Sequence, residues 1–485
     1  LFSNPPKLNI IALQDSQPER LEAFSQDLAN TSLEKSDLKE LLELFEHSST
    51  FGSLIQVPAT FSQKLPELES KLNTALESGD IFVQQSAHEL LPLLKQAKLL
   101  AQQYDAVIAN PPYMGGKGMN AALKDFAKKQ FPDSKSDLFA MFIERGFAWC
   151  KDSGFNSMVT MQSWMFLSSY EAMREKLLQG RTLSCMVHMG NGVMGIAFGT
   201  AATIMLNNHI SNYAGSFSYC ENDDVNEFGI PKQFPVQNER LKTAKPDDFK
   251  KIPGSPVAYW VSDKVRDAFY HNPDLSKIGN PTGGMTTGNN DLFLRLWFEV
   301  SYLKIGLGFS DRKTALASKL KWFPYNKGGS FRKWYGNNEF VVNWEYDGKD
   351  IQDSGRAFPR SKNYYFKRSI TYSSTSSSYF GVRASEEGFL FDAKGSSIFV
   401  DGESHYGVLA FLVSKPVTFF LRFLNPTIEF QTGDIARLPL SDKIALNNSN
   451  ISIAKAAIQI SKSDWDSYET SWDFTQNPMI RTRQS

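Results

Sequence analysis

The stretch Tyr104-Asp105-Ala106-Val107-Ile108-Ala109-Asn110-Pro111-Pro112-Tyr113 decides the fold of this chain. Its apolar run, Ala106–Ala109, has the composition of a strand and leads directly into Asn-Pro-Pro-Tyr. In an open α/β sheet, ligands bind beyond the carboxyl ends of the strands. We therefore expect residues 110–113 to lie at the mouth of an active site.

The composition of this loop suits methyl transfer to an exocyclic amine. The lone pair of such a nitrogen is delocalised into its ring, and a site can restore it by accepting both N–H hydrogens. The side-chain oxygen of Asn110 is one acceptor. The carbonyl of Pro111 is a natural second, because Pro111 and Pro112 fix φ at about −65° and hold the turn rigid. The ring of Tyr113 offers a flat face on which a base can stack.

A second Asn-Pro-Pro triplet, at residues 4–6, serves as an internal comparison. No apolar strand precedes it, and Lys7 stands where the motif has Tyr113. The triplet alone is therefore a weak signal, whereas the preceding strand and Tyr113 make residues 110–113 specific. We interpret residues 4–7 as a loop without chemistry.

Short apolar runs alternate with helical stretches after the motif. Strands are predicted at Ser157–Met161, Leu183–His188 and Ala201–Leu206, in addition to Ala106–Ala109. Helices are predicted at Asp137–Cys150 and, after a Ser168-x-x-Glu171 capping box, at Tyr170–Leu178. Strands that alternate with helices indicate an α/β fold class.

The rest of the chain divides by composition. A Thr31-x-x-Glu34 capping box precedes leucines at helical spacing, and one long helical stretch is predicted at His405–Leu424. The polar residues 221–256 contain four prolines, which is typical of a linker. The expected segments are a helical segment at 1–103, the α/β region at 104–220, the linker at 221–256, a loop-rich mixed module at 257–440 and a helical tail at 441–485.

Charge is unevenly distributed along the chain. With 52 Lys and Arg against 52 Asp and Glu, the formal net charge is zero, which on its face argues against nucleic-acid binding. Residues 241–440, however, carry 27 basic against 20 acidic side chains, a net charge of +7 that the remainder balances with −7. Residues 301–383 alone carry 15 against 6. A basic module joined to an acidic one indicates that the basic module contacts nucleic acid.

Several other classes of protein are excluded or disfavoured. A hydrophobic content of 41% is that of a globular chain, and no apolar run approaches the ~18 residues of a membrane span. The three cysteines, Cys150, Cys185 and Cys220, are too scattered for a disulfide framework or a zinc site, and none follows proline as a cytosine C5 nucleophile usually does. The six histidines lack metal-ligand spacing, so we expect no metal. A reducing cytoplasm is the expected location.

In these features the chain resembles the amino-methyltransferases that use S-adenosylmethionine, whose catalytic motif is Asp/Asn/Ser-Pro-Pro followed by Tyr, Phe or Trp. The Asn form with Tyr points within that family mainly to N6 of adenine in DNA. Asn110–Asn120, Lys135–Arg145 and Met158–Ser169 resemble, more narrowly, the PglX-type adenine methyltransferases of bacterial phage-exclusion (BREX) systems. Thr286–Phe293 and Asn425–Pro439 resemble the two ends of a target-recognition domain, so the resemblance covers the whole chain.

The resemblance implies a fold, a cofactor and a reaction. The implied fold is a Rossmann-like S-adenosylmethionine-dependent methyltransferase fold, preceded by helices and followed by a mixed α+β target-recognition domain at 257–440. The implied reaction transfers a methyl group from S-adenosylmethionine to an adenine in double-stranded DNA. That adenine must be flipped out, because its amino group is otherwise buried in base pairing. Other phage-defence proteins are the expected partners.

Site residues follow from the resemblance position by position. The catalytic loop corresponds to Asn110, Pro111, Pro112 and Tyr113, with Asn110 also facing the cofactor. Phe198 matches an aromatic residue that stacks on the flipped base together with Tyr113. Phe142 matches an aromatic residue that touches the adenine of the cofactor, and Asp137 lies in the same motif as a further candidate for cofactor binding.

The basic module supplies the candidates for DNA contact. Its Lys and Arg side chains lie among Trp and Tyr residues, and such cations neutralise phosphates or read guanine edges while aromatic rings stack or wedge. The predicted DNA-binding residues are Thr287, Asn289, Arg312, Lys313, Arg332, Arg368 and Arg383.

The chain departs from the family at the cofactor loop. A glycine-rich loop and an acidic ribose ligand are expected upstream of the catalytic motif, and residues 1–103 contain neither. The stretch Gly190–Gly195 has the pattern G-x-G-x-x-G, but it coincides with the base-stacking segment and lacks the later acidic residue. Because the chain also starts at Leu1, we expect an N-terminally truncated chain that binds S-adenosylmethionine poorly by itself.

Two alternatives remain open. Methyltransferases acting on RNA bases or on a protein amide share the Asn-Pro-Pro-Tyr chemistry, but they generally lack a large domain such as residues 257–440. A non-catalytic DNA-recognition or assembly subunit of a phage-defence system would keep the same fold without turnover.

Overall fold

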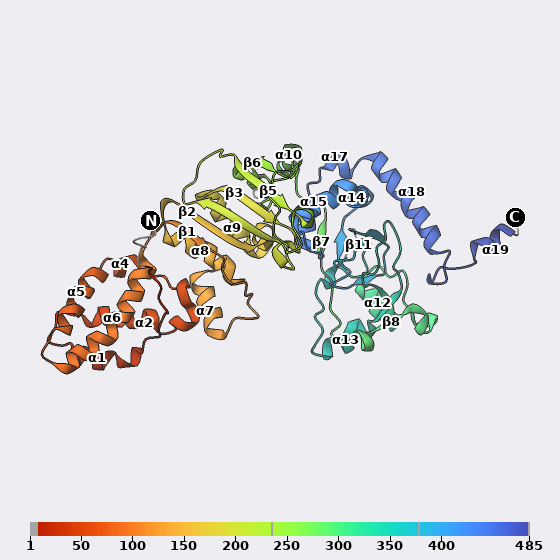
Figure 1. Ribbon diagram of the computed structural model, residues 1–485. Coiled ribbons are helices and arrows are strands. Elements are labelled where there is room, and N and C mark those ends of the chain that lie inside the picture. Colours follow the sequence, from red (N-terminus) through yellow and green to blue (C-terminus); the bar gives the residue numbers. More distant parts are fainter. Residues whose placement is uncertain (1–7, 234–235, 377–378, 484–485) are drawn as a thin grey trace. The chain divides into compact units, whose positions relative to one another are not determined.

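The chain folds as two compact units in a computed structural model that describes residues 8–233, 236–376 and 379–483 (Figure 1). The first unit runs to Lys250 and includes Val257–Trp260. The second comprises Lys251–Pro256 and the chain from Val261 onward. Residues 4–7, the second Asn-Pro-Pro stretch, lie outside the described residues.

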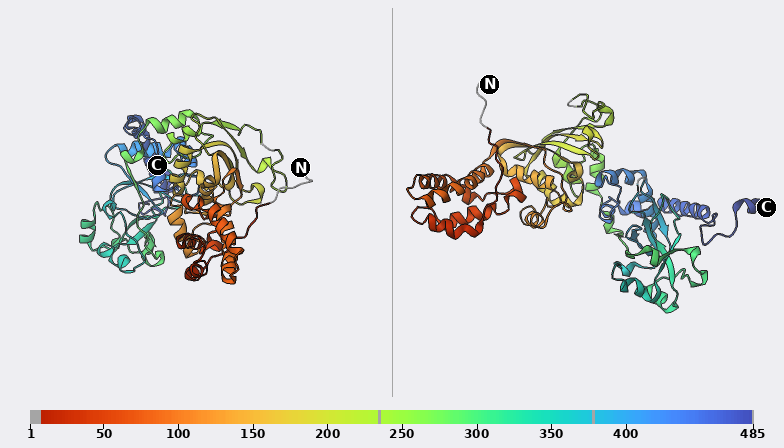
Figure 2. Two further views of the ribbon diagram at one scale, coloured as in Figure 1. Left: turned by 90° about the vertical axis from the view of Figure 1, so that its left-hand side faces the viewer. Right: turned by 60° about the horizontal axis from the view of Figure 1, so that its bottom comes forward.

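The first unit begins with a helical bundle, drawn in red and orange in Figures 1 and 2. The apolar stripes of its helices form one core, in which Phe45, Phe61 and Leu90 are completely buried. Helical structure predicted before Tyr104 is therefore present. The helices are α1 (Leu21–Asp27), α2 (Lys35–Phe45), α3 (Ser48–Phe51), α4 (Ala59–Ser62), α5 (Leu65–Leu76) and α6 (Ile81–Ala101).

Both predicted capping boxes are wrong. Helix α2 begins at Lys35 with Glu34 as its N-cap, and the hydroxyl of Thr31 donates to the carbonyl of Leu28 instead (2.6 Å). Helix α9 (Glu171–Gly180) begins after a 3-10 turn at Ser168–Tyr170 and has no side-chain cap. In each case the Ser or Thr lies in the preceding turn, where local hydrogen bonding competes with capping.

A six-stranded sheet follows, in the order β1-β2-β4-β3-β5-β6. Strands β1, β2, β3 and β5 run in one direction, whereas β4 and β6 are antiparallel to their neighbours. The carboxyl ends of β1, β2 and β3 therefore meet the start of β4 at one edge of the sheet. The strands are β1 (Tyr104–Ala109), β2 (Cys150–Met161), β3 (Thr182–Met189), β4 (Thr200–Leu206), β5 (Gly215–Cys220) and β6 (Lys242–Ala244), and the first four contain the predicted strands.

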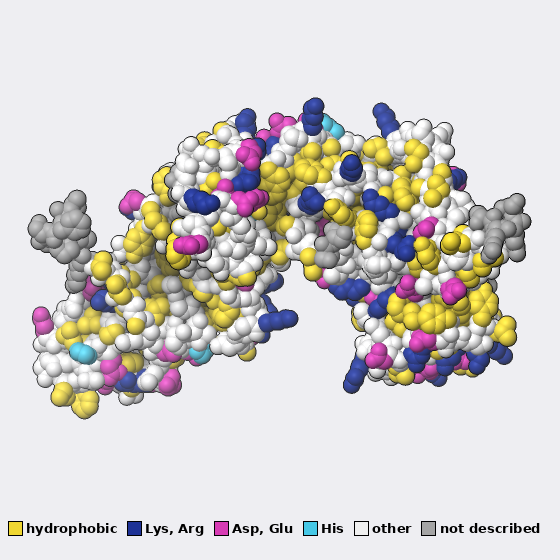
Figure 3. All heavy atoms as spheres, turned by 45° about the vertical axis from the view of Figure 1, so that its right-hand side comes forward, with side chains coloured by type: hydrophobic (Ala, Val, Ile, Leu, Met, Phe, Trp, Pro, Cys, Tyr) yellow, Lys and Arg dark blue, Asp and Glu magenta, His cyan; other side chains and the backbone are white. Residues whose placement is uncertain are grey.

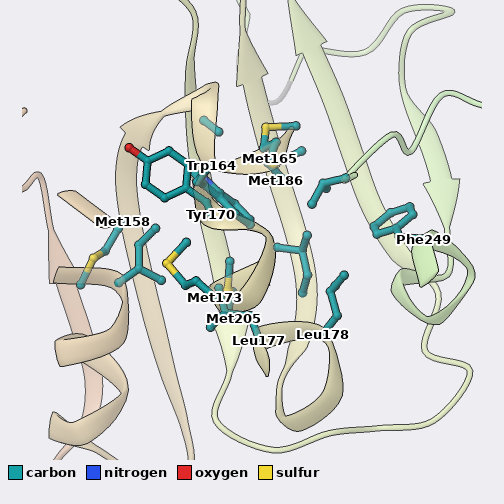
Figure 4. Close-up of a cluster of buried hydrophobic side chains, with 14 of the residues drawn as sticks. Met158, Trp164, Met165, Tyr170, Met173, Leu177, Leu178, Met186, Met205 and Phe249 are labelled. Atoms are coloured by element: carbon teal, nitrogen blue, oxygen red, sulfur yellow. The ribbon is translucent and has the colours of Figure 1, made fainter. Parts of the chain in front are cut away.

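One face of this sheet is covered by helices α8 (Leu138–Trp149) and α9, and α7 (Ala121–Gln130) precedes α8. Figure 4 shows the shared core, in which Met158 of β2, Met173 of α9 and Met186 of β3 point into the same cluster. Trp164 and Met165, just after β2, are also fully buried there. This packing holds the carboxyl end of β2 rigidly at the edge of the sheet where β1 and β3 also end.

The second unit contains two four-stranded sheets, in the orders β13-β9-β10-β8 and β12-β11-β14-β7. Its core is aromatic, with Tyr325, Trp344 and Tyr365 nearly inaccessible. The strands are β7 (Asn280–Thr282), β8 (Leu294–Leu296), β9 (Trp322–Asn326), β10 (Phe340–Asn343), β11 (Ser369–Tyr372), β12 (Val382–Ser385), β13 (Leu390–Phe391) and β14 (Ser397–Phe399). The helices are α10 (Asp263–His271), α11 (Asn290–Phe293), α12 (Arg312–Ser318), α13 (Glu345–Asp353), α14 (Ser404–Val413), α15 (Lys415–Leu424), α16 (Thr432–Ala436), α17 (Asp442–Ala445), α18 (Asn448–Trp465) and α19 (Pro478–Arg483).

Two predicted segments differ from the structure. The segment predicted as a linker, 221–256, contributes β6 to the sheet of the first unit, and Pro246 begins a 3-10 helix at Pro246–Lys251. The stretch predicted as one helix, His405–Leu424, is two helices that bend by 69° at Ser414, because Pro416 cannot continue α14. No single described helix is long and apolar enough to cross a membrane, and this bent pair meets that test only jointly.

Candidate active site

The Asn-Pro-Pro-Tyr loop leaves the sheet where β1 ends at Ala109. Asn110 and Pro112 are exposed, whereas Pro111 is buried beneath them. The buried ring anchors the loop and the fixed proline torsions keep it from adopting helix. Asn110 is thus an exposed residue directly after the carboxyl end of β1, and its catalytic role stays a prediction.

Tyr113 turns back over the sheet and lies among four neighbours. Its hydroxyl donates to the carbonyl of Val159 (3.3 Å) or to Oδ1 of Asn110 (3.4 Å). Its ring meets Phe139 edge-on at a centroid distance of 6.0 Å and Phe198 at 5.8 Å with an interplanar angle of 61°. Burial raises the pKa of Tyr113, so the hydroxyl keeps its proton near neutral pH.

Asp137 has a different role from the predicted one. Its Oδ1 accepts the backbone N–H of Met114 (2.9 Å) and that of Phe139 (3.3 Å), which makes it the N-cap of α8. The residue is 8% exposed, and burial raises the pKa of its carboxyl group. Because this carboxyl group is buried and engaged by the backbone, the prediction that Asp137 binds cofactor is wrong for this structure.

Phe142 projects from α8 and is half-buried. It packs against both the core of the sheet and a smaller cluster that contains Leu123 of α7 and Phe131. The structure therefore places Phe142 in α8, the helix whose N-cap is Asp137.

The segment between β3 and β4 brings Phe198 to Tyr113 of the Asn-Pro-Pro-Tyr loop. Gly192 and Gly195 adopt positive φ values of 87° and 72°, and after a short 3-10 turn the chain returns as β4. A dinucleotide-type loop would be followed by a helix whose N-terminus binds phosphate, and none follows here. Phe198 is 38% exposed, so its ring is available to a ligand.

A buried polar chain at the same edge was not predicted from the sequence. Nε2 of His188, near the end of β3, lies 2.6 Å from Oε1 of Gln162, the first residue after β2. Nδ1 of His188 lies 3.3 Å from the hydroxyl of Tyr259, and burial lowers the pKa of His188 to about 4. The position of Gln162 directly after a predicted strand was the available signal, because strand ends carry sites in this architecture.

The predicted DNA-binding residues do not form one free basic surface. In the second unit Lys and Arg side chains (dark blue) alternate with Asp and Glu (magenta), as Figure 3 shows. Asn289 and Lys313 are exposed at the starts of α11 and α12. Arg312 is half-buried and bonds Asp347 with Nε (2.9 Å) and Nη2.

Two further arginines are held by neighbours within the second unit. Arg332 lies over the ring of Trp465 at 4.7 Å, and its Nη1 is 3.9 Å from Asp464. Arg368 donates to the carbonyl of Gly402 (2.9 Å) and lines an open cavity of about 1090 Å³ together with Lys277 and Lys367.

Thr287 and Arg383 are buried, with exposed fractions of 2% and 1%. The hydroxyl of Thr287 donates to Oδ1 of Asn290 (2.7 Å), and Arg383 lies in the middle of the sheet strand β12. A DNA phosphate cannot reach either side chain here, so their prediction as DNA contacts is wrong for this structure. The described residues also contain no group of three His, Cys, Asp or Glu that could hold a metal ion.

Comparisons with known proteins show what the chain is similar to. The model of the Eco57I restriction-modification methylase family matches residues 11–194. "Adenine-specific methyltransferase BrxX" of Escherichia coli O9:H4 (strain HS) is 41% identical over 98% of this chain and 40% of its own length. "Adenine-specific methyltransferase PglX" of Lacticaseibacillus casei (strain Zhang) is 36% identical over 95% of this chain and 40% of its own length.

Among solved structures, the type IIL restriction-modification enzyme MmeI in complex with DNA aligns with 78% of this chain and 53% of its own, with a TM-score of 0.45 and 12% identity. The chain spans about two fifths of the length of the curated relatives that it matches. The alignments with those two relatives cover 98% and 95% of this chain. The chain therefore belongs to the family of PglX-type adenine-specific methyltransferases.

Proposed function

We propose that the polypeptide carrying this chain methylates N6 of adenine in double-stranded DNA, using S-adenosylmethionine. The observation that carries the proposal is the Asn110–Tyr113 loop at the carboxyl end of β1, in a chain that is 41% identical to an adenine-specific methyltransferase. Membership in this family implies use of S-adenosylmethionine.

The residues of the loop fit the chemistry of an amine nucleophile. The exposed Oδ1 of Asn110 can accept one N–H of the adenine amino group, and the Pro111 carbonyl can accept the other. Accepting both hydrogens localises the nitrogen lone pair and aims it at the methyl group. Tyr113 releases Oδ1 for this role because its hydroxyl also has the Val159 carbonyl as an acceptor.

A base rotated out of the duplex needs an aromatic surface to replace its stacking. Tyr113 and Phe198 both expose part of their rings, and their centroids lie 5.8 Å apart. Each ring can take one contact with the base, at about 1–3 kcal/mol per stacked base. These two side chains come from different loops, one after β1 and one before β4.

The cofactor would be held only in part by the residues proposed for it. Asn110 and Phe142 fit, because one is exposed at the loop and the other is half-buried on the adjoining helix. Asp137 does not fit, because its carboxyl group already caps α8 and the Met114 amide. When bound, S-adenosylmethionine supplies the electrophilic methyl group, and Asn110 orients the amine toward it.

DNA contact is proposed for the second unit. Lys313 is exposed in the first turn of α12, and Asn289 is exposed at the start of α11. Lys277, Lys367 and Arg368 line the cavity of about 1090 Å³, which also contains the ring of Tyr364. Glu386, Glu387 and Asp401 line the same cavity and balance its three cations, so the proposal of phosphate contact rests on Lys313 and Asn289.

Tritiated methyl transfer tests the function directly. The complete polypeptide that carries residues 1–485 is incubated with labelled S-adenosylmethionine and a duplex library, followed by nucleoside analysis. Label in N6-methyladenine supports the proposal, and the Asn110→Ala variant is the matched inactive control. Label only in RNA or protein substrates would support the first alternative, and the absence of label from every substrate would support a non-catalytic recognition subunit.

A role in phage defence, together with other proteins of such a system, is a further part of the proposal. It rests on family membership. Cells carrying the wild-type gene and its neighbours should resist phage infection in a plaque assay, whereas cells carrying Asn110→Ala should lose resistance or lose self-protection. Equal plaque counts in all strains would contradict this role.

A further inference from the structure

Gln162 is tied to the start of β4 by its backbone and by its side chain. Its N–H donates to the carbonyl of Gly199 (3.0 Å), and its Oε1 lies 2.6 Å from Nε2 of His188. Gly199 directly follows Phe198. The backbone that carries the proposed base-stacking ring is therefore in contact with the first residue after β2.

The contact with Gly199 requires a residue without a side chain. A Cβ built on Gly199 would lie 2.4 Å from Cδ of Gln162 and 2.5 Å from its Nε2. Gly199 is not among the residues with positive φ, so backbone conformation does not demand glycine there. The glycine instead permits the amide group of Gln162 to pack on the main chain.

The amide group of Gln162 is not free to move away from this contact. His188 is only 6% exposed and its ring lies between Gln162 and Tyr259. Burial lowers the pKa of His188 to about 4, so the ring is neutral at physiological pH. With Oε1 facing Nε2, this nitrogen donates, and Nδ1 accepts from the Tyr259 hydroxyl. The hydrogen-bond chain thus fixes the far end of Gln162.

We propose that Gln162 is a positioning residue for base stacking: its amide, held by His188 and packed on Gly199, fixes the backbone from which Phe198 faces Tyr113. This inference rests on the proposed function, in which these two rings receive the adenine. The 190–199 segment has other ties, such as the Gly192 N–H to the Ile196 carbonyl (2.8 Å). Gln162 is the tie adjacent to Phe198.

A double-variant cycle separates this role from general packing. The variants are Gln162→Ala, Gly199→Ala and the double variant, made in the complete polypeptide. Gly199→Ala must push the Gln162 amide off His188, whereas in the Gln162→Ala background the added methyl group has no amide to meet. Gly180→Ala is the matched control, because a Cβ at Gly180 has no atom within 4 Å.

Two readouts are expected to respond. Hydrogen exchange of the amides in 190–199 should accelerate about tenfold in both single variants and no further in the double variant. The kcat for methylation should fall about tenfold to a hundredfold in each, with KM for S-adenosylmethionine unchanged, because a small misplacement of a stacking ring affects the reacting geometry. Gln162→Glu, which keeps the acceptor oxygen, should recover part of the rate.

The outcomes are distinguishable. Multiplicative effects of the two substitutions would overturn the proposal, and so would unchanged exchange at 190–199 in Gln162→Ala. Loss of exchange protection throughout β2, β3 and β4 would also overturn it, because Gln162 would then be supporting the fold. A wild-type polypeptide that methylates no adenine would refute the proposed function, while the exchange pattern would still decide whether Gln162 positions Phe198.

Discussion

Oδ1 of Asp137 accepts the backbone N–H of Met114 over 2.9 Å, and this bond ties the residue after the Asn-Pro-Pro-Tyr loop to the start of α8. The tie is doubled, because the Leu138 N–H donates to the Met114 carbonyl over 3.1 Å. The loop is therefore fixed at both ends, by β1 before it and by the capped helix after it. A rigid loop holds the acceptors of Asn110 and Pro111 in one geometry.

We predict that Asp137→Ala reduces both stability and methylation. In this variant the backbone N–H groups of Met114 and Phe139 lose their side-chain acceptor. The loss should lower the free energy of unfolding by about 1–3 kcal/mol. Denaturant unfolding measures the first effect and labelled methyl transfer the second. Asp125→Ala on the exposed surface of α7, where the carboxylate pairs with the exposed Lys128, should change stability by less than about 0.5 kcal/mol. Equal behaviour of the two variants would contradict the anchoring role.

Asn110→Ala should reduce methylation strongly while leaving the fold intact. The side chain is exposed, and its removal creates no cavity, so the free energy of unfolding should change by less than about 0.5 kcal/mol. Loss of an acceptor that acts on the nucleophile should lower kcat by about 10²–10³. Asn110→Asp keeps an oxygen acceptor and should retain more activity than Asn110→Ala. Wild-type rates in Asn110→Ala would refute the site.

The arrangement of the catalytic edge followed from local sequence. The apolar runs at β1–β4 and the motif after β1 were enough to place Asn110 and Tyr113, because strand ends carry the site in an α/β sheet. The exposure of β1 did not follow. Ile108 is 81% exposed, although its apolar neighbours are typical of a buried strand. An apolar pattern predicts a strand, but it does not predict which elements cover each face of that strand.

The basic module shows where composition misleads. Arg383 is one of the basic residues that give the module its net positive charge. Its side chain is buried where β12 pairs with β11, and this burial depends on long-range packing that composition does not report. Tyr325, Tyr365 and Tyr372 likewise form the core of the second unit, although in the sequence they alternate with cations. Gln162 was missed for the opposite reason, because its partners His188 and Gly199 are distant in the chain.

Lys313→Glu should weaken DNA binding and flatten its dependence on salt. A lysine that contacts one phosphate contributes about −0.9 to the slope of log K against log salt, and reversal of its charge should remove at least that much. Arg383→Met is the comparison, because burial removes this side chain from the surface and lowers its pKa to about 10. Its slope should equal that of the wild type. A changed slope in Arg383→Met, with none in Lys313→Glu, would reverse the assignment.

His188 should make the first unit lose stability as the pH falls. Burial lowers its pKa from 6.5 to about 4. Above pH 6.5 the ring is neutral in both the folded and the unfolded chain, so it contributes no pH dependence there. Between pH 6.5 and 4 the unfolded chain binds a proton that the folded chain does not, and the free energy of unfolding therefore decreases, by up to about 3 kcal/mol.

His188→Gln isolates this effect. Glutamine keeps polar contact with Gln162 and Tyr259 but does not titrate, so the difference in unfolding free energy between wild type and variant should shrink by about 3 kcal/mol from pH 7 to pH 4. The difference is the informative quantity, because His405 in the second unit, whose pKa burial lowers to about 3, destabilises both proteins equally on acidification. Hydrogen exchange of the β3 amides reports on the first unit by itself. Parallel pH profiles for the two proteins would show that folding does not lower the pKa of His188, so that the ring gains its proton in the folded chain as readily as in the unfolded chain, and the buried neutral hydrogen-bond chain from Tyr259 to Gln162 would then be wrong.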